Sequence, residues 1–225
     1  MMDPGDEGDG WGIFGGSGES LDLVKEGIEL YTRGKYTDAL DRFNAATEED
    51  PTSPAAWLNK GGALTVLGKY EEAHDAFEEA LRLDSGNALV LRNKGITEIY
   101  LGRLGDAAPT RSRALDLNAR NGPAWFSLAG VQERLGRREL AAQSLEKGLS
   151  LEPSRADAWY RLGLSLRETG EEEEAVGAFD HALEIEPRHQ GAWYNRGLAL
   201  FTLARYVESV TSFERALEID PADAG

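Results

Sequence analysis

The chain has 225 residues, a formal net charge of −16 and no cysteine. The missing thiols exclude disulfides, thiolate metal sites and cysteine nucleophiles. No apolar run approaches the roughly 18 to 20 residues that a membrane span needs, and the acidic first twenty residues do not resemble a signal peptide, so we expect a cytoplasmic protein.

Residues 1–19 form an acidic, glycine-rich segment without a basic residue. This composition cannot bury enough apolar surface to fix its own backbone, so we expect a disordered tail. Trp11, Ile13 and Phe14 are three large apolar residues within it. Such a cluster is typical of a short segment that docks on a partner, and packing over the first helix as an end cap fits it equally well.

Small residues recur every 34 residues after this tail, without insertion or deletion: Gly27, Gly61, Gly95, Ala129, Gly163 and Gly197. A fixed period of this length indicates stacked helical repeats. Other residue types keep the same period, namely Trp57, Trp125, Trp159 and Trp193, then Phe43, Phe77, Phe179 and Phe213, then Ala39, Ala73, Ala107, Ala141 and Ala175, then Pro51, Pro153, Pro187 and Pro221.

This pattern resembles the tetratricopeptide repeat. Six copies cover residues 20–223, divided as 20–53, 54–87, 88–121, 122–155, 156–189 and 190–223. The resemblance implies an all-α fold, a right-handed α-solenoid of six helix-turn-helix repeats. The periodicity inside each copy also predicts two antiparallel helices. We expect Gly61 to be small because two backbones approach there, and Phe77 to fill the remaining space.

The third copy is irregular. Leu91 replaces the tryptophan, Arg111 takes the phenylalanine position, and Pro109 lies near the start of the second helix. Proline is tolerated in a first helical turn because its missing N–H would have no partner there. We therefore expect a short, slightly displaced helix and not a break.

The charge is unevenly distributed. Residues 88–155 hold eleven basic and seven acidic residues, whereas the segments before and after them are strongly acidic. Duplex nucleic acid would be repelled by the acidic ends, which disfavours a duplex-binding function. The basic middle is either a binding surface or ordinary solvated surface.

Tetratricopeptide arrays commonly hold an extended peptide in a concave groove built by the first helices, so the resemblance implies such a groove here. The residues that helical spacing places on this wall are Asn59, Asn93, Tyr100, Phe126, Arg134, Tyr160, Arg161, Arg167, Tyr194 and Asn195. Side-chain amides can bond a peptide backbone, and arginines beside aromatic rings suit an acidic, aromatic peptide. The alternative is that Glu133 and Glu168 merely neutralise the arginines in surface pairs.

Catalysis finds no support in the sequence. His74, His181 and His189 are scattered, and no nucleophile, metal-ligand set or phosphate loop accompanies them. The spacing of Gly10 and the glycines after it matches a dinucleotide fingerprint, but no strand precedes it. We expect no enzyme activity, no cofactor and no metal.

The sequence therefore favours a protein-protein interaction scaffold that binds an extended acidic or aromatic peptide. One alternative is a self-assembling module. In it, the tail occupies a groove, in its own chain or a neighbour's, or the last repeat pairs in a homodimer through Val210, Phe213 and Leu217. That face could instead be covered in a longer chain. Further alternatives are the substrate-recruiting part of a larger enzyme and a weak single-stranded RNA binder.

Overall fold

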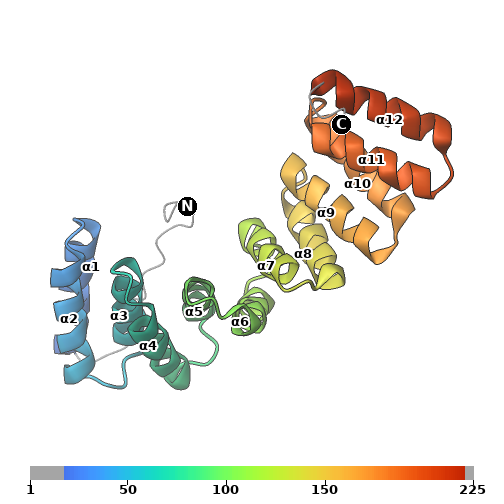
Figure 1. The fold of residues 1–225 in the computed structure, drawn as a ribbon. Coiled ribbons are helices and arrows are strands. Elements are labelled where there is room, and N and C mark those ends of the chain that lie inside the picture. Colours follow the sequence, from blue (N-terminus) through green and yellow to red (C-terminus); the bar gives the residue numbers. More distant parts are fainter. Residues whose placement is uncertain (1–17, 221–225) are drawn as a thin grey trace. The chain divides into compact units, whose positions relative to one another are not determined.

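The structure is a computed structural model that describes residues 18–220, and these residues form twelve α-helices and no strand (Figure 1). The helices are α1 (Gly18–Thr32), α2 (Tyr36–Glu49), α3 (Pro54–Val66), α4 (Tyr70–Leu83), α5 (Ala88–Tyr100), α6 (Leu104–Leu117), α7 (Gly122–Arg134), α8 (Arg138–Leu151), α9 (Ala156–Thr169), α10 (Glu172–Ile185), α11 (Gln190–Thr202) and α12 (Tyr206–Ile219). Consecutive helices pack as pairs, which confirms the predicted all-α helical repeats. The first turn of α1 includes Gly18 and Glu19, two residues that the sequence assigned to the tail.

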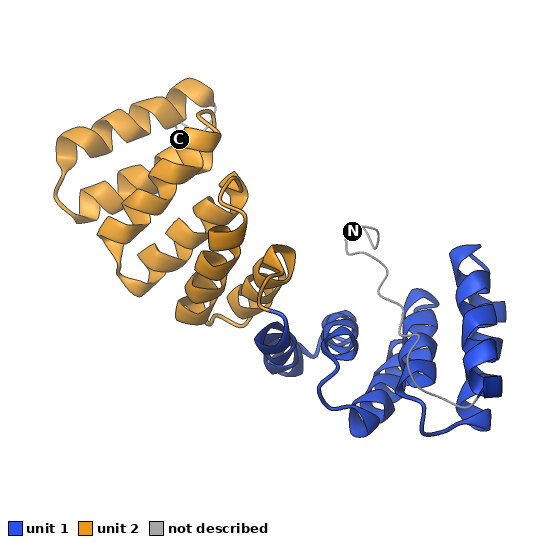
Figure 2. Cartoon of the chain, turned by 180° about the vertical axis from the view of Figure 1, so that it is seen from behind, with its two compact units in different colours: residues 1–118 blue, residues 119–225 orange. Residues whose placement is uncertain are grey.

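The chain divides into two compact units, residues 1–118 and 119–225 (Figure 2). Inside each unit, the second helix of one pair contacts the first helix of the next. First helices of neighbouring pairs also contact one another, as α1 with α3, α3 with α5, and α9 with α11. Second helices in the described part of the chain make no comparable contact. The first helices therefore line the inner, concave side of each unit.

Short polar side chains and glycines set the helix ends. Ser53 begins α3 by accepting a hydrogen bond on its hydroxyl oxygen from the backbone N–H of Ala56, at 3.3 Å. The turn inside each of the first five repeats has a glycine in the left-handed region, such as Gly68 with φ 75°. The sixth repeat has Ala204 at this position, with φ 59°. A residue with a side chain is strained there by about 1–2 kcal/mol.

The predicted close approach of the paired helices is confirmed at Gly61. A Cβ added to this glycine would lie only 2.5 Å from Cε1 of Phe77, whose ring is completely buried. The first, fifth and sixth repeats use the same combination of glycine and phenylalanine. In these four repeats the two helices are thus joined by an aromatic ring packed directly on backbone.

The fourth repeat reaches the same packing with a different set of side chains. Ala129 and Leu145 replace the usual glycine and phenylalanine, and both are fully buried. The missing aromatic ring is supplied by Phe126, which packs on Gly148 where all five other repeats have alanine. Volume lost at one contact is therefore recovered at the neighbouring one, as a close-packed interior requires.

The third repeat departs from expectation in its second helix. Pro109 is the sixth residue of α6, beyond the first turn, yet α6 keeps the fourteen residues of the other second helices. The prediction of a short helix is wrong. Pro109 removes one backbone hydrogen bond, but burial of neighbouring residues such as Ala107 and Leu115 keeps this part of the chain helical. Arg111 is 3% exposed, and its aliphatic stem covers Gly95 in place of the usual ring.

The helices that the structure describes include none that is long and apolar enough to cross a membrane.

Candidate functional site

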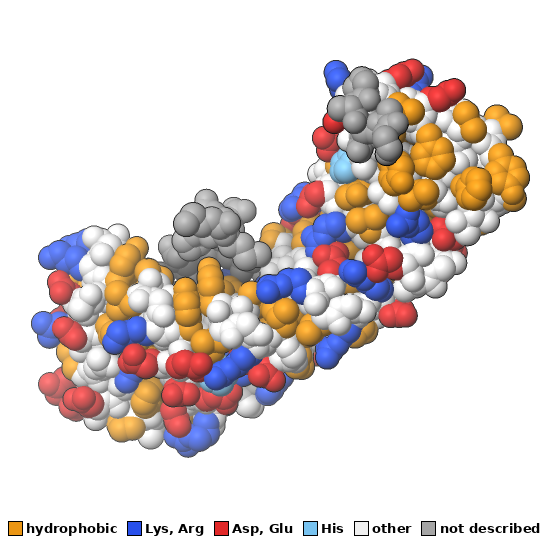
Figure 3. Space-filling model, viewed as in Figure 1, with side chains coloured by type: hydrophobic (Ala, Val, Ile, Leu, Met, Phe, Trp, Pro, Cys, Tyr) orange, Lys and Arg blue, Asp and Glu red, His pale blue; other side chains and the backbone are white. Residues whose placement is uncertain are grey.

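The concave side of residues 119–225 carries exposed aromatic rings on α11. Tyr194 is 51% exposed and Phe201 is 60% exposed. Tyr206, from the start of α12, packs edge-on against Phe201 with the ring centroids 5.5 Å apart. Figure 3 shows hydrophobic side chains gathered over these two helices. Rings held rigidly in this way offer a large contact area at little entropic cost to a ligand.

Arg161 on α9 is held by an acidic partner on the same face. Its guanidinium donates to both carboxylate oxygens of Glu133 on α7, at 3.0 and 2.9 Å, and reaches the backbone oxygen of Phe126 at 3.4 Å. Both charged side chains are about one quarter exposed. Arg161 is therefore neutralised by Glu133, as the alternative reading of the sequence predicted.

Arg134 and Arg167 are not neutralised in this way. Glu168 pairs with Arg138 of α8, and neither Arg134 nor Arg167 has an ion pair within the described residues. Burial raises the pKa of Glu172, at the start of α10, and the positive charge of Arg167 only partly offsets this effect. Arg134 at the end of α7 and Arg167 on α9 thus carry no ion pair among the residues described.

Tyr160 and Asn195 are joined to each other. The amide nitrogen of Asn195 donates to the Tyr160 hydroxyl at 3.3 Å and to the backbone oxygen of Gly191 at 2.7 Å. The Tyr160 ring also lies against His189, with centroids 4.5 Å apart. These contacts connect α9 to the start of α11 and fix the spacing of the two inner helices.

Three predicted groove residues are buried, which corrects their assignment to an accessible wall. Asn59 is 1% exposed and donates to the Ala55 backbone oxygen at 2.8 Å, and Asn195 bonds its own helix in the same way. Phe126 is 6% exposed because it fills the space above Gly148. At these two positions of the predicted row, the side-chain amide donates a hydrogen bond to the backbone of its own helix.

The remaining predicted residues of the concave side lie in the other unit or outside the description. Asn93 is half-buried on α5. Tyr100 is exposed and stacks on Tyr70, with centroids 4.7 Å apart. The proposed docking residues of the tail, Trp11, Ile13 and Phe14, lie outside the residues that the structure describes.

Sequence reasoning missed the aromatic pairs on the inner side. Phe201 contacts Tyr206, Tyr100 contacts Tyr70, and Tyr31 contacts Tyr36. In each pair one ring comes from the end of a first helix and the other from the start of a second helix. Tyrosine recurs at the latter place in three repeats, and this was the available signal.

No described residues gather into a group of three or more histidine or carboxylate side chains that could hold a metal ion. The three histidines are occupied separately: His189 accepts the capping hydrogen bond of α11, His181 lies against Trp159, and His74 lies near carboxylates.

Comparison with known proteins places these features in a family. Tetratricopeptide repeat models match residues 24–88, 92–149, 131–187 and 191–223. No curated protein matches the chain in sequence. Among solved structures, YrrB, described as "a TPR protein with an unusual peptide-binding site", is 24% identical with a TM-score of 0.70, covering 80% of this chain and 93% of its own. A MamA structure is 26% identical with a TM-score of 0.61, covering 73% and 96%. The chain therefore belongs to the tetratricopeptide repeat family.

Proposed function

We propose that this protein is an interaction scaffold whose concave side in residues 119–225 binds an extended peptide carrying acidic and aromatic side chains. The observation that carries the proposal is the combination of two guanidinium groups without ion pairs, Arg134 and Arg167, with the exposed rings of Tyr194 and Phe201 on the same first-helix side. The arginines would pair with carboxylates, and the rings would pack against apolar side chains.

The likeness to YrrB supports the class of ligand only in outline, because the shared feature is the fold. The chemistry of the ligand is argued from this chain's own residues. An acidic peptide is favoured over a basic one because Glu133 is already paired with Arg161, which leaves positive charge in excess among the inner residues of α7 and α9.

The experiment measures binding of fluorescein-labelled ten-residue peptides by anisotropy. One peptide alternates glutamate with phenylalanine, a second replaces each glutamate by glutamine, and a third replaces each phenylalanine by alanine. We expect the first to bind best. The double variant R134Q/R167Q should weaken it at least about tenfold, since hydrogen bonds to charged groups contribute about 1.5–3 kcal/mol each and 1.4 kcal/mol is a factor of ten.

Arg215 supplies the matched control. It is an exposed arginine on α12, a second helix, where it pairs with Glu218. Arg215→Gln removes one positive charge from the same unit and should leave the affinity unchanged. Equal binding of the first two peptides, or an equal loss in R215Q and R134Q/R167Q, would show that general charge and not this surface governs binding. A uridine oligomer that binds more tightly than every peptide would favour RNA.

Self-association through the last helix is a second candidate function. Val207 is 83% exposed, and Val210 and Leu217 are also exposed on α12, as the sequence predicted for the latter two. Phe213 is only partly exposed because its ring packs on Gly197. Neighbouring exposed apolar side chains often mark an interface.

Light scattering across concentration tests this second candidate. A dimer that becomes a monomer in V207E/V210E would support it. A wild-type protein whose mass stays that of one chain at every concentration would dismiss it, without bearing on the peptide surface of α7, α9 and α11.

A further inference from the structure

The tryptophan position has a defined task in four repeats. The indole N–H of Trp57 donates to the backbone oxygen of Pro51 at 2.9 Å, six residues earlier. Trp125, Trp159 and Trp193 make the same bond, at 2.8 to 3.0 Å. Each indole thereby holds the loop that precedes its own helix and fills the space beside it.

The third repeat lacks this ring. Leu91 takes the position, and the loop carbonyl that an indole would hold belongs to Ser85. Arg113 from α6 donates to that oxygen at 2.7 Å. The hydrogen bond of the missing indole is thus replaced, but its volume is not.

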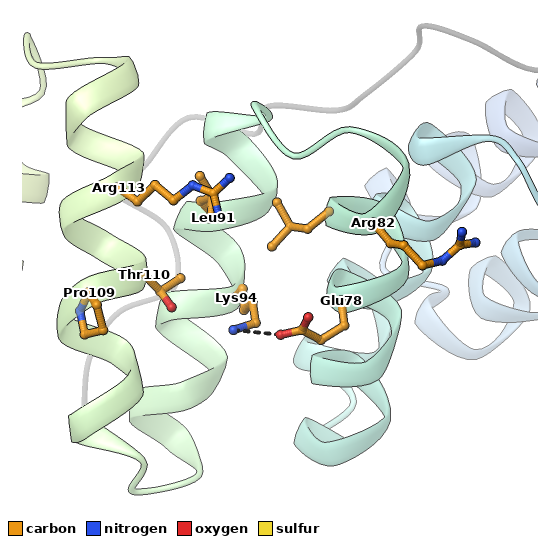
Figure 4. Close-up of a pocket in the computed structure, with 8 residues that line it drawn as sticks. Glu78, Arg82, Leu91, Lys94, Pro109, Thr110 and Arg113 are labelled. Atoms are coloured by element: carbon orange, nitrogen blue, oxygen red, sulfur yellow. Dashed lines mark ion pairs between the residues drawn. The ribbon is translucent and has the colours of Figure 1, made fainter.

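A pocket of about 400 Å³ lies at this place, between α4, α5 and α6 (Figure 4). Leu81 and Leu91 supply apolar surface, Pro109 and Thr110 form the α6 wall, and the Arg113 side chain extends toward Leu91. The pocket combines apolar surface from Leu81, Leu91 and Pro109 with polar or charged groups from its other lining residues, which suits one flat aromatic side chain with a polar edge.

The polar side of the pocket is rigid. Lys94 is 9% exposed and bonds the fully buried Glu98 at 2.5 Å and Glu78 at 3.0 Å. Lys94 is therefore engaged by carboxylates on two helices. Arg113 differs, because it has no carboxylate partner among the residues described. A ligand with a carboxylate beside its ring would complete this site.

We propose that Trp11 of this same chain occupies the pocket and supplies the ring that the third repeat lacks. The chain has five tryptophans, and Trp11 is the one outside the repeats. Asp9 lies two residues before it in the sequence and would pair with Arg113, and the tail has no basic residue that would oppose this contact.

The reach of the chain allows this contact. Trp11 precedes Gly18, the first residue of α1, by seven residues, which span about 24 Å when extended. The first helices run in the same direction, and α1 contacts α3, which contacts α5. Two such steps of packed helices amount to about 16–20 Å and end at the axis of α5, so about 4–8 Å of the extended segment and the length of the Trp11 side chain are left to reach the pocket beside it. Leu91 lies in the first turn of α5, at the same end as Gly18, and an attached tail reaches about millimolar effective concentration.

The test uses the full chain labelled with 5-fluorotryptophan, whose five fluorine resonances are read by NMR. The Trp11 signal is assigned from the variant Trp11→Phe. We expect this signal to be shifted and broadened as part of the folded unit, independently of protein concentration. Leu91→Trp places an indole in the pocket covalently. This variant should give a sharp Trp11 signal at the chemical shift of an unfolded peptide.

Leu23→Trp is the matched control. Leu23 fills the tryptophan position of the first repeat, so the same substitution is made in α1, away from the pocket in the third repeat. It should leave the Trp11 signal unchanged. Displacement of Trp11 by L23W and not by L91W would mean that the tail caps α1, and the proposal would be wrong.

Amide hydrogen exchange gives a second readout that does not depend on L91W folding. Trp11→Ala should speed exchange at the end of α4 and the start of α5, with no change in α2. A sharp Trp11 signal in the unaltered chain, unaltered exchange in W11A, or a Trp11 signal that shifts with concentration would each overturn the intramolecular contact. None of these outcomes bears on peptide binding by residues 119–225.

Discussion

The contact between Gly61 and Phe77 permits a sharp test of how the repeats are packed. Gly61→Ala would bring a methyl group to 2.5 Å from a ring carbon, about 1 Å inside ordinary contact, against a ring that is fully buried. Alanine gains about 1 kcal/mol over glycine in a helix, but overpacking of a tight core costs about 1–3 kcal/mol. We expect a net loss of up to about 2 kcal/mol.

The fourth repeat indicates how this loss can be reversed, because it pairs Ala129 with Leu145 at the same two positions. Phe77→Leu alone should destabilise through a cavity, yet G61A/F77L should be more stable than the sum of the two changes by about 1–3 kcal/mol. Urea unfolding followed by circular dichroism measures all four proteins, and amide exchange in α3 and α4 localises the effect.

The adjacent glycine makes the control. A Cβ at Gly62 meets nothing within 4 Å, so Gly62→Ala should show only the helical gain of about 1 kcal/mol. If G61A stabilises as much as G62A, or if G61A and F77L are additive within about 0.5 kcal/mol, the ring does not limit the approach of these helices.

Three further outcomes are expected. Lys94→Met should cost about 3–5 kcal/mol at neutral pH because it leaves Glu98 buried with no partner on its own helix, and K94M/E98L should recover part of that loss in urea unfolding. Burial opposes ionisation of Asp157, but the hydrogen bond and charge of Arg155 outweigh burial and lower the Asp157 pKa. The ionised Asp157 therefore stabilises the fold above the ordinary pKa of 3.8, and this contribution is lost as pH falls through the lowered pKa. Arg155→Gln should raise the Asp157 pKa in an NMR titration, and Arg188→Gln should not. Pro109→Ala should stabilise α6 by up to about 3 kcal/mol, and a lower melting temperature would show that proline is needed there.

The repeat pattern predicted the helices well because one packing rule recurs at fixed spacing. Gly61 and Phe77 could be paired from sequence, since the combination returns in other copies. The irregular copies could not be read this way. The position of Pro109 within α6 depends on where the helix begins, which Arg103 and the preceding turn decide.

The concave side was only partly predictable. Spacing alone placed Phe126 on that wall, but whether a side chain at this position faces inward or is buried depends on the volume opposite it, and Gly148 provides that volume only in this repeat. Helical spacing also does not predict which atoms accept hydrogen bonds from the buried side-chain amides. Asn59 bonds a backbone oxygen of its own helix, which a residue pattern does not encode.

Ala204 has a consequence for the order in which the protein comes apart. In a repeat array each helix pair is stabilised by its neighbours, and the sixth repeat contacts one neighbouring pair within the described chain. The strained left-handed turn between α11 and α12 weakens that same repeat. We expect α12 to detach first on heating, so that limited proteolysis begins at this turn while the inner repeats remain folded.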